Sequence, residues 1–584
     1  MKKRVLLVNP PDVDASMFDY DTAKRGRANN YPAYGLGVIA RNLIDHGHRV
    51  QILNLNHELL KIVHDSTAPI DYDATWNRLL EEAILSFEPD VIGVTCLFSV
   101  THKSLVNVCH AVRLYSQATL VIGGVHVTHD VDAIFAETGA DLAFVHESEQ
   151  AFLDWLETGL LTQVVTREGK FLEKNMPTSL DAIPPFELMD VESHSLYGTL
   201  GSWYGFRYES TRIATALSNR GCRAHCSFCN VRSFNGEGVR QRTVEVVLDE
   251  LQRLKDRGVG HIIWLDDDLL FREERALELF NGMVRKNLNM TWDATNGVIA
   301  ASLKEEIVAA AAESGCIGLA LGIESGNAEI LRRIKKPGTP RIFRRAADVL
   351  RRYPSINVRA LLIIGFPNET YRQIRDTIQL CEDMNLDWHN IAILQPWKNT
   401  PIYDEMVDQG LLGEEGKLKG DVSPYQLGPY SRQRAVEQGR IKQASSSLPD
   451  FSDLDRVPTR KELDDLWFYL NAKLNFERLL HEVRVEKLRQ QLTWLRYVST
   501  KTAPDNALIL YFYAYLQWRV NGEILQSTQD AVMRRLQESE YWQGKFNDLG
   551  ISEWDVVQHS FPESLFDEAP MHFRMPEQAD AVVH

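Results

Sequence analysis

The sequence predicts an α/β protein in three parts: a doubly wound, flavodoxin- or Rossmann-like parallel sheet, a partial (βα)6 barrel, and a mainly helical C-terminal domain. The first two parts are predicted because short apolar runs alternate with amphipathic segments in two successive regions of the chain. In the last third, longer amphipathic segments replace this alternation. A chain of 584 residues also exceeds what one hydrophobic core usually serves. We expect domains at 1–160, 211–410 and 411–584, with a connector at 161–210.

Composition limits the partners and the compartment. Acidic residues number 80 against 64 basic ones, and the net charge of −16 argues against nucleic acid as a partner. No run of about 18 apolar residues predicts a membrane span. The apolar run at 4–9 ends at Asn9-Pro10-Pro11 and predicts a first strand, not a signal peptide. An odd cysteine count of seven favours a reducing cytoplasm.

The first domain is predicted from its regular spacing of strands and helices. Ligands of such sheets bind at the carboxyl ends of the strands. The expected strands are 4–9, 49–55, 91–95, 119–122 and 142–145, and the expected helices are 35–46, 76–87, 103–115 and 130–138.

The middle of the chain repeats the βα pattern with longer helices. Six strands favour a partial barrel over a closed one of eight strands, and charged or glycine residues at strand ends mark the reactive edge. The expected strands are 212–217, 261–265, 290–294, 318–322, 357–364 and 388–394, with helices 243–257, 273–286, 304–314, 341–352 and 371–385 between them. Beyond a linker or substrate-covering loop at 413–460, helices are expected at 461–497, 506–518 and near 527–538.

Three cysteines stand on one short loop, Cys222, Cys226 and Cys229, in the spacing C-x3-C-x2-C. Structural zinc sites use four ligands, usually as two separated pairs, and no second C-x2-C pair is present. His225 would have to turn back to complete a Cys3His site. Three thiolates on a [4Fe–4S] cluster leave one iron open to a ligand. The spacing therefore favours the cluster and leaves zinc as the alternative.

This spacing, with the aromatic Phe228 before the last cysteine, resembles the signature of radical S-adenosylmethionine (SAM) enzymes. The resemblance extends through roughly the first 410 residues. It implies that SAM chelates the open iron and is cleaved to a 5′-deoxyadenosyl radical when the cluster is reduced. It also implies an external low-potential electron donor of flavodoxin or ferredoxin type.

The first 160 residues resemble the cobalamin-binding (B12) domain that precedes many radical SAM barrels. The resemblance rests on VNPP, PAYGLGVIARNLIDHGH, EPDVIGVTC, VIGGVHVT and GADLAFVHESEQAF. It implies that Gly93, Gly123 and Gly124 let the backbone approach a corrin ring, with His126 at its edge. The D-x-H-x-x-G motif that supplies a histidine to cobalt elsewhere is missing, so the lower face of cobalt is open, held by water or filled from elsewhere. The alternative is a sheet of the same shape that binds no corrinoid.

The same resemblance places SAM at the strand ends of the barrel. Asp266 and Asp267, in the run 266–268, match a DD pair near SAM, whereas the alternative is a helix cap with solvated charges. Glu324 matches a polar residue that binds the ribose or amino group, and its alternative is an ion pair with Arg332 or Arg333. Gly365, in a Gly-Phe-Pro turn, would lie near the adenine.

The function implied is a cobalamin-dependent radical SAM methyltransferase. It would act on an unactivated carbon of a small-molecule substrate, of natural-product or cofactor type, through a 5′-deoxyadenosyl radical and methylcobalamin. One alternative keeps the radical but catalyses cyclisation, rearrangement or oxidation without methyl transfer. An alternative of another class is a zinc-stabilised binding protein.

Overall fold

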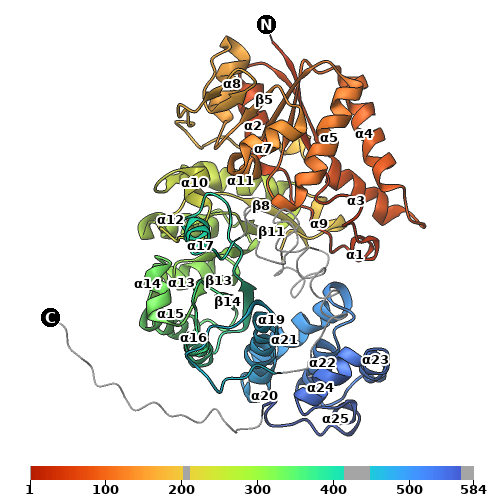
Figure 1. Cartoon of the computed structure of the whole chain (residues 1–584), viewed down its shortest axis with the longest axis vertical. Coiled ribbons are helices and arrows are strands. Elements are labelled where there is room, and N and C mark those ends of the chain that lie inside the picture. The colour runs from red at the N-terminus through yellow and green to blue at the C-terminus, as the bar shows by residue number, and fades with distance from the viewer. Residues whose placement is uncertain (1, 202–210, 413–447, 567–584) are drawn as a thin grey trace, which may run out of the picture.

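The computed structural model describes residues 2–201, 211–412 and 448–566. Its three parts follow one another along the long axis (Figure 1), with the N-terminal sheet at one end, the barrel in the middle and the C-terminal helices at the other end. Most of the predicted linker at 413–460 lies outside the described residues. None of the helices in the described part is long and apolar enough to cross a membrane.

The first domain is one seven-stranded sheet in the order β2-β1-β3-β4-β5-β6-β7. Its first five strands are parallel, which confirms the predicted doubly wound sheet. These strands are β1 (Arg4–Asn9), β2 (Arg49–Asn54), β3 (Val91–Thr95), β4 (Thr119–Gly123) and β5 (Leu142–Phe144). The interior strand β1 is buried on both faces, as its unbroken apolar run Val5–Val8 requires.

Helices cover both faces of this sheet. One apolar cluster joins strand residues to α2 (Tyr34–Asp45) and α8 (Glu149–Thr158), and another joins them to α3 (Leu55–Asp65), α4 (Tyr72–Phe87) and α5 (His102–Tyr115). Two short helices, α6 (Val125–His129) and α7 (Val131–Thr138), follow β4. Helices α3, α6 and α8 have no counterpart in the sequence prediction.

The predicted connector at 161–210 begins too early. Strands β6 (Val164–Thr166) and β7 (Lys170–Phe171) pair antiparallel and extend the first sheet beyond β5. Two-residue and three-residue strands carry too little periodicity to be recognised in sequence. Beyond them the described chain is largely irregular, with a 3₁₀-helical turn (Phe186–Leu188) and a short α-helix, α9 (His194–Tyr197).

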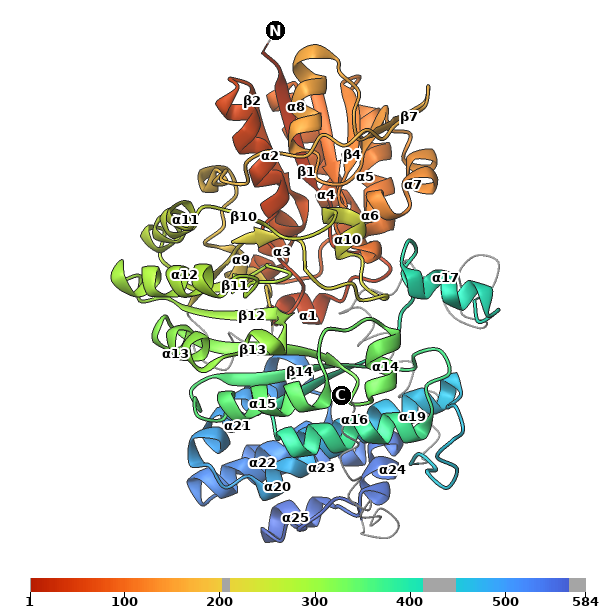
Figure 2. The ribbon, with the colours of Figure 1, turned by 90° about the vertical axis from the view of Figure 1, so that its left-hand side faces the viewer.

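The barrel has the six predicted parallel strands, in the order β15-β14-β13-β12-β11-β8. They are β8 (Arg212–Ala216), β11 (Val259–Trp264), β12 (Thr291–Val298), β13 (Cys316–Glu324), β14 (Asn357–Ile364) and β15 (Trp388–Ile393). Figure 2 shows β11, β12, β13 and β14 lying one below another, with helices α11 (Val244–Asp256), α12 (Glu273–Arg285), α13 (Glu305–Glu313), α15 (Pro340–Leu350) and α16 (Tyr371–Met384) beside them.

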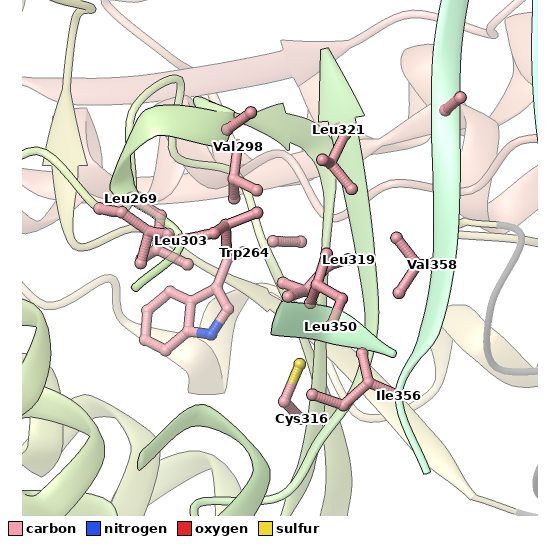
Figure 3. Packing of buried hydrophobic residues seen from close by; sticks show 14 of the residues in the cluster. Trp264, Leu269, Val298, Leu303, Cys316, Leu319, Leu321, Leu350, Ile356 and Val358 are labelled. Atoms are coloured by element: carbon pink, nitrogen blue, oxygen red, sulfur yellow. The ribbon is translucent and has the colours of Figure 1, made fainter. Parts of the chain in front are cut away.

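Apolar packing between the strands and these helices holds the barrel together. Figure 3 shows Leu319, Leu321 and Val358 of β13 and β14 packed with Leu350 and Ile356. Because side chains alternate along a strand, the residues between these point to the opposite, inner face of the barrel.

The C-terminal domain is helical, as predicted, but it has more and shorter helices than the sequence analysis expected. The single helix expected at 461–497 is α19 (Arg460–Asn471), a π-helical turn (Ala472–Glu477), α20 (Arg478–His481) and α21 (Val485–Tyr497). The chain leaves the helix at Glu482, whose carboxylate accepts hydrogen bonds from the Arg484 backbone and guanidinium. The helices that follow are α22 (Ala507–Asn521), α23 (Gln526–Gln537), α24 (Glu540–Asp548) and α25 (Glu553–Gln558), of which the last two were not expected.

The C-terminal helices also reach the first domain. The guanidinium of Arg27 donates to the Tyr497 hydroxyl at 2.7 Å, and that of Arg25 donates to the carbonyl of Lys501 at 3.1 Å. The C-terminal helices therefore contact the first domain as well as the barrel.

Candidate active site

The three predicted cluster ligands lie on a loop that leaves β8 and is fixed at both ends. Gly221 begins the loop with a φ of +87°, and a Cβ there would lie 2.4 Å from the carbonyl oxygen of Gly238. The Ser227 amide donates to the carbonyl of Ile334 and its own carbonyl accepts from the Ile402 amide. Phe228 packs against Phe366, with ring centroids 6.1 Å apart. The loop is thus held by the barrel rather than by its own contacts.

The thiols of the three cysteines share one partly buried place. Burial, opposed by the Lys336 charge and assisted by the nearby Cys229 and Cys222, raises the pKa of Cys226 to about 12. Burial likewise raises the pKa of Cys229 to about 11. A positively charged metal centre reverses this preference, because a coordinated thiol is deprotonated. The Ala224 amide lies 3.4 Å from the Cys222 sulfur, as a donor that tunes a cluster would.

The donor set fits a cluster better than a single ion. Within the described residues, no group of three His, Cys, Asp or Glu side chains is placed to hold one metal ion. A [4Fe–4S] cluster spreads its thiolates over different irons, so its ligands need not converge on one point. The arrangement lends no support to the zinc alternative.

The three adjacent aspartates after β11 have three different partners. Asp266 is buried and accepts from the backbone amide and hydroxyl of Ser218, and burial raises its pKa to about 7. Asp268 accepts both arms of the Arg223 guanidinium, at 2.7 and 2.8 Å. Asp267 accepts from the Asn235 amide at 3.1 Å and lines a cavity. Of the predicted DD pair, Asp267 is the member that faces open space.

Glu324 ends β13 in a strained conformation, with a φ of +64°. Its carboxylate pairs with the ammonium of Lys336 at 2.8 Å, and both side chains are largely buried. Glu324 thus forms an ion pair, as the alternative interpretation expected, but the predicted partners Arg332 and Arg333 are wrong, because the partner is Lys336. The charge of Lys336 also acts on Cys226 and Cys229, which places this ion pair beside the cysteine loop.

Gly365 follows β14 with a φ of +82°. A Cβ there would meet the Leu463 side chain of α19 at 2.7 Å, and its amide donates to the Glu369 carboxylate at 2.7 Å. The glycine is required by this close approach, and its place beside the adenine stays a prediction.

Two adjoining cavities lie where the first sheet meets the barrel. The larger, of about 780 Å³, is lined by Thr95 and His126 from the first domain and by Asp267 and Thr295 from the barrel. The smaller, of about 330 Å³, is lined by the strand ends of the first sheet and by Asp267. Both sheets thus present their carboxyl ends to one interior space, where ligands of such sheets bind.

The predicted glycines Gly93, Gly123 and Gly124 all line the smaller cavity. Gly124 has a φ of +112°, and a Cβ there would lie 2.5 Å from the carbonyl oxygen of Cys96. A Cβ on Gly123 meets only ordinary contacts, so this glycine keeps cavity space open rather than relieving a clash. An apolar slot with a glycine wall fits the flat corrinoid that the sequence implied.

Histidines of α6 line the larger cavity. The ring of His126 bonds to His102 at 3.1 Å, and His102 in turn bonds to the Glu137 carboxylate at 2.9 Å. Burial lowers the pKa of His126 to about 3 and that of His129 to about 4, so both rings are neutral. Neither ring nitrogen of His129 has a hydrogen-bond partner among the described residues.

Several charged interactions of the site were not foreseen. Arg220, next to the cysteine loop, pairs with Glu147 and Glu149 of the first domain, each at 2.6 Å. Lys336 and Arg359 also belong to this group. A single arginine in the buried strand β14 was a usable signal, because a charge inside an apolar run needs a reason.

Comparisons with known proteins agree with this arrangement. Residues 217–381 match the Radical SAM superfamily and residues 25–156 match the B12 binding domain. The chain is 26% identical over 467 residues to the cytidylyl-2-hydroxyethylphosphonate methyltransferase of Streptomyces wedmorensis, covering 71% of this chain and 84% of that protein.

Two solved structures share the fold. The radical SAM methyltransferase TsrM from Kitasatospora setae, determined with cobalamin and a [4Fe–4S] cluster, superposes with a TM-score of 0.59 at 17% identity, over 92% of this chain and all of that one. The cobalamin-dependent SAM radical enzyme OxsB, determined with aqua-cobalamin and SAM, gives a TM-score of 0.54 at 15% identity, over 96% and 83% of the two chains. The chain belongs to the radical SAM enzymes that carry an N-terminal B12-binding domain.

Proposed function

We propose that this enzyme is a cobalamin-dependent radical SAM methyltransferase that acts on an unactivated carbon of a small molecule. The observation that carries the proposal is the cavity of about 780 Å³, which joins the strand ends of both domains. Its lining includes Asn230, which follows the last cysteine of the loop, and it shares Thr95, Val125 and Asp267 with the glycine-lined slot. Its volume lies within the range of small-molecule sites, about 300–1,000 Å³.

The relatives support the same activity. The Streptomyces wedmorensis protein and TsrM are both described as methyltransferases, and TsrM was determined with cobalamin and a [4Fe–4S] cluster. The four cysteines outside the loop, Cys96, Cys109, Cys316 and Cys381, are buried in apolar surroundings and form no second three-cysteine group for internal electron transfer. We therefore infer an external donor of flavodoxin or ferredoxin type and a reducing, cytoplasmic setting.

Different residues of the chain would bind the cluster, SAM and cobalamin. Cys222, Cys226 and Cys229 would hold the cluster, Asp267 and Glu324 would hold SAM, and the glycine-lined slot would hold cobalamin. When bound, the cluster supplies the electron that cleaves SAM, and cobalamin supplies a carrier for its methyl group. The Arg223–Asp268 fork fixes the cysteine loop against β11, so the reacting groups keep their spacing.

One assay tests the proposal. Anaerobic enzyme is incubated with methyl-labelled SAM, a reductant and candidate substrates, and the product is examined for label alongside 5′-deoxyadenosine. We expect label in the product, and we expect Cys226→Ala to abolish both signals. Formation of 5′-deoxyadenosine with an altered but unlabelled product would instead establish cyclisation, rearrangement or oxidation without methyl transfer.

A further inference from the structure

A strongly basic segment of the barrel lies against the cysteine loop. From Arg332 to Arg345 the chain carries seven lysines and arginines and no acidic residue, although the net charge of the whole chain is −16. The segment begins at the end of α14 (Ala328–Arg333) and continues into α15. The amide of Ser227, which stands between the second and third cysteines, donates to the carbonyl of Ile334 at 2.9 Å. The basic segment is therefore in direct contact with the loop that would hold the cluster.

Two cations of this segment are exposed beside the loop. Lys336 is paired with the largely buried Glu324, and the guanidinium of Arg333 donates to a backbone carbonyl. By contrast, Arg332 and Lys335 are exposed, and their side chains have no ion-pair or hydrogen-bond partner within the described ranges of the chain. Unpaired charges at a surface attract a partner of opposite charge and guide its approach.

The backbone of Lys335 has an unusual conformation. Its φ is +55°, in the left-handed region that favours glycine and asparagine. Its amide donates to the carbonyl of Arg332 at 3.2 Å, so this residue closes the last turn of α14. Glycine would adopt this conformation at lower cost, and the lysine side chain makes no internal contact that would offset the difference. The position of its ammonium group therefore calls for a reason outside the stability of the fold.

The opposite flank of the loop carries the opposite charge. Helix α17 (Pro401–Asp408) contacts the loop through the Ile402 amide, which donates to the Ser227 carbonyl at 3.0 Å. Its exposed residues include Asp404 and Asp408. Both α14 and α17 lie to the right of the barrel strands in Figure 2. An acidic protein that approaches the loop would be attracted to the α14 flank and repelled from the α17 flank, which gives it one orientation.

The cysteine loop itself reaches the surface. His225, which directly precedes Cys226, is exposed. Because the electrons are inferred to come from an external donor, that donor has to come close to this loop. Electron carriers of the flavodoxin type are small acidic proteins, and electron-transfer partners meet through small interfaces in which charge guides the encounter.

We propose that the surface formed by Arg332, Lys335 and His225 binds an acidic electron-carrier protein of the flavodoxin type. The proposal rests on the proposed function, because it says where the external donor inferred there binds. One electron passes from the reduced flavin of the carrier to the cluster, so the exchange balances without a further reactant. Binding is weak and sensitive to salt, because the charges on this surface are exposed.

Binding of an acidic bacterial flavodoxin tests this surface without turnover. Oxidised flavodoxin is titrated into the anaerobic holoenzyme by isothermal titration, at about 20 mM and about 500 mM salt. We expect the double variant Arg332→Gln with Lys335→Gln to bind about fivefold more weakly at low salt and like the parent at high salt.

The matched control removes the same charge from the opposite edge of the barrel. Arg253 and Arg285 are exposed in the last turns of α11 and α12, which lead into the beginnings of the next strands. The double variant Arg253→Gln with Arg285→Gln should bind flavodoxin as the parent does at both salt concentrations.

A second measurement compares two reductants. Formation of 5′-deoxyadenosine is followed with reduced flavodoxin below saturation and with titanium(III) citrate, which is small and needs no docking surface. In the Arg332 and Lys335 double variant we expect a rate about fivefold lower with flavodoxin and unchanged with titanium citrate. A loss with both reductants would show that the substitutions disturb the cysteine loop, and it would overturn the proposal.

The outcomes separate this proposal from the proposed function. If the unaltered enzyme does not bind flavodoxin at low salt, the docking surface is wrong, even if no variant folds. Equal flavodoxin affinity in the parent and the Arg332 and Lys335 double variant also overturns it, as does an equal loss in the control. A single-stranded RNA that binds the parent more tightly than flavodoxin does would overturn the choice of partner. Failure of the labelled-methyl assay with titanium citrate, with flavodoxin binding intact, removes methyl transfer and leaves the docking surface standing.

Discussion

Asp266 and Asp267 are neighbours in sequence, but their side chains meet different surroundings. Asp266 is 3% exposed and holds Ser218 at the base of the cysteine loop, whereas Asp267 faces the cavity. We expect Asp267→Asn to weaken SAM binding about tenfold in equilibrium dialysis, with little change in thermal stability. Asp266→Asn should instead lower the free energy of unfolding by about 1–3 kcal/mol, because a buried acceptor is exchanged for a donor. Loss of SAM binding in the Asp266 variant alone would contradict this division.

Alanine substitutions at three glycines of the first domain are expected to have three different effects. Gly124→Ala places a Cβ 2.5 Å from a backbone oxygen and should unfold or distort the strand end after β4. Gly123→Ala should fold but bind cobalamin at least about tenfold more weakly, measured by the visible spectrum of the corrinoid, since its methyl group takes up space in the wall of the slot. Gly139→Ala is the control: its φ is also positive, +61°, but nothing lies within 4 Å, so it costs about 1 kcal/mol. A cobalamin affinity equal in all three would show that the slot is not the corrinoid site.

At the scale of elements, the strands that position the site were predictable and the short connections were not. Strands β3 and β14 have the predicted bounds because each is a mainly apolar run between polar helices, although Arg359 interrupts the run in β14. The pair β6 and β7 was missed because strands of two or three residues have no measurable period. The Glu324–Lys336 pair joins residues whose contact depends on the turn after α14 (Ala328–Arg333), which periodicity does not fix.

The short helix α9 is attached to α3 by two stacked histidines. The rings of His57 and His194 lie 3.8 Å apart, with Asp190 and Lys61 beside them. Burial lowers the pKa of His57, and it lowers that of His194 to about 3. The unfolded chain binds protons at these rings below about pH 6.5 and the folded chain does not, so stability is full above that pH and falls as the pH drops.

We expect this attachment to loosen between pH 6.5 and pH 5, by up to about 1.4 kcal/mol per pH unit from the His194 ring, with a contribution of the same sign from His57. Hydrogen exchange of amides 186–200, corrected for the intrinsic rate, measures the loss of protection. His194→Gln keeps polar partners but does not titrate, so its protection should depend less on pH. His46→Gln, at an exposed position, should behave as the parent does. An equal pH dependence in the His194 variant would assign the effect to other groups.

At the scale of the whole molecule, a buried ionic network joins the first domain to the cysteine loop. Arg220 of β9 (Asn219–Arg220) contacts Glu147 and Glu149, and Arg240 of β10 (Arg240–Gln241) also pairs with Glu147. The side chains of Glu147 and Glu149 are only 3% and 10% exposed. The network therefore fixes the distance between the two halves of the cavity, and its loss should separate them.

We expect Arg220→Gln to cost about 3–5 kcal/mol, because it leaves two buried carboxylates with one cation between them. The cost should appear as a split calorimetric transition, with the first domain unfolding before the barrel, since the network acts between them rather than within either. Arg4→Gln removes an exposed pair with Glu88, whose side chains are 36% and 72% exposed, and should cost less than about 1 kcal/mol. The double variant Arg220→Gln with Glu149→Gln removes one charge of each sign, so it should recover part of the lost stability. A single, equally lowered transition in the Arg220 variant would mean that the network supports the barrel alone, because only a contact between domains changes their order of unfolding.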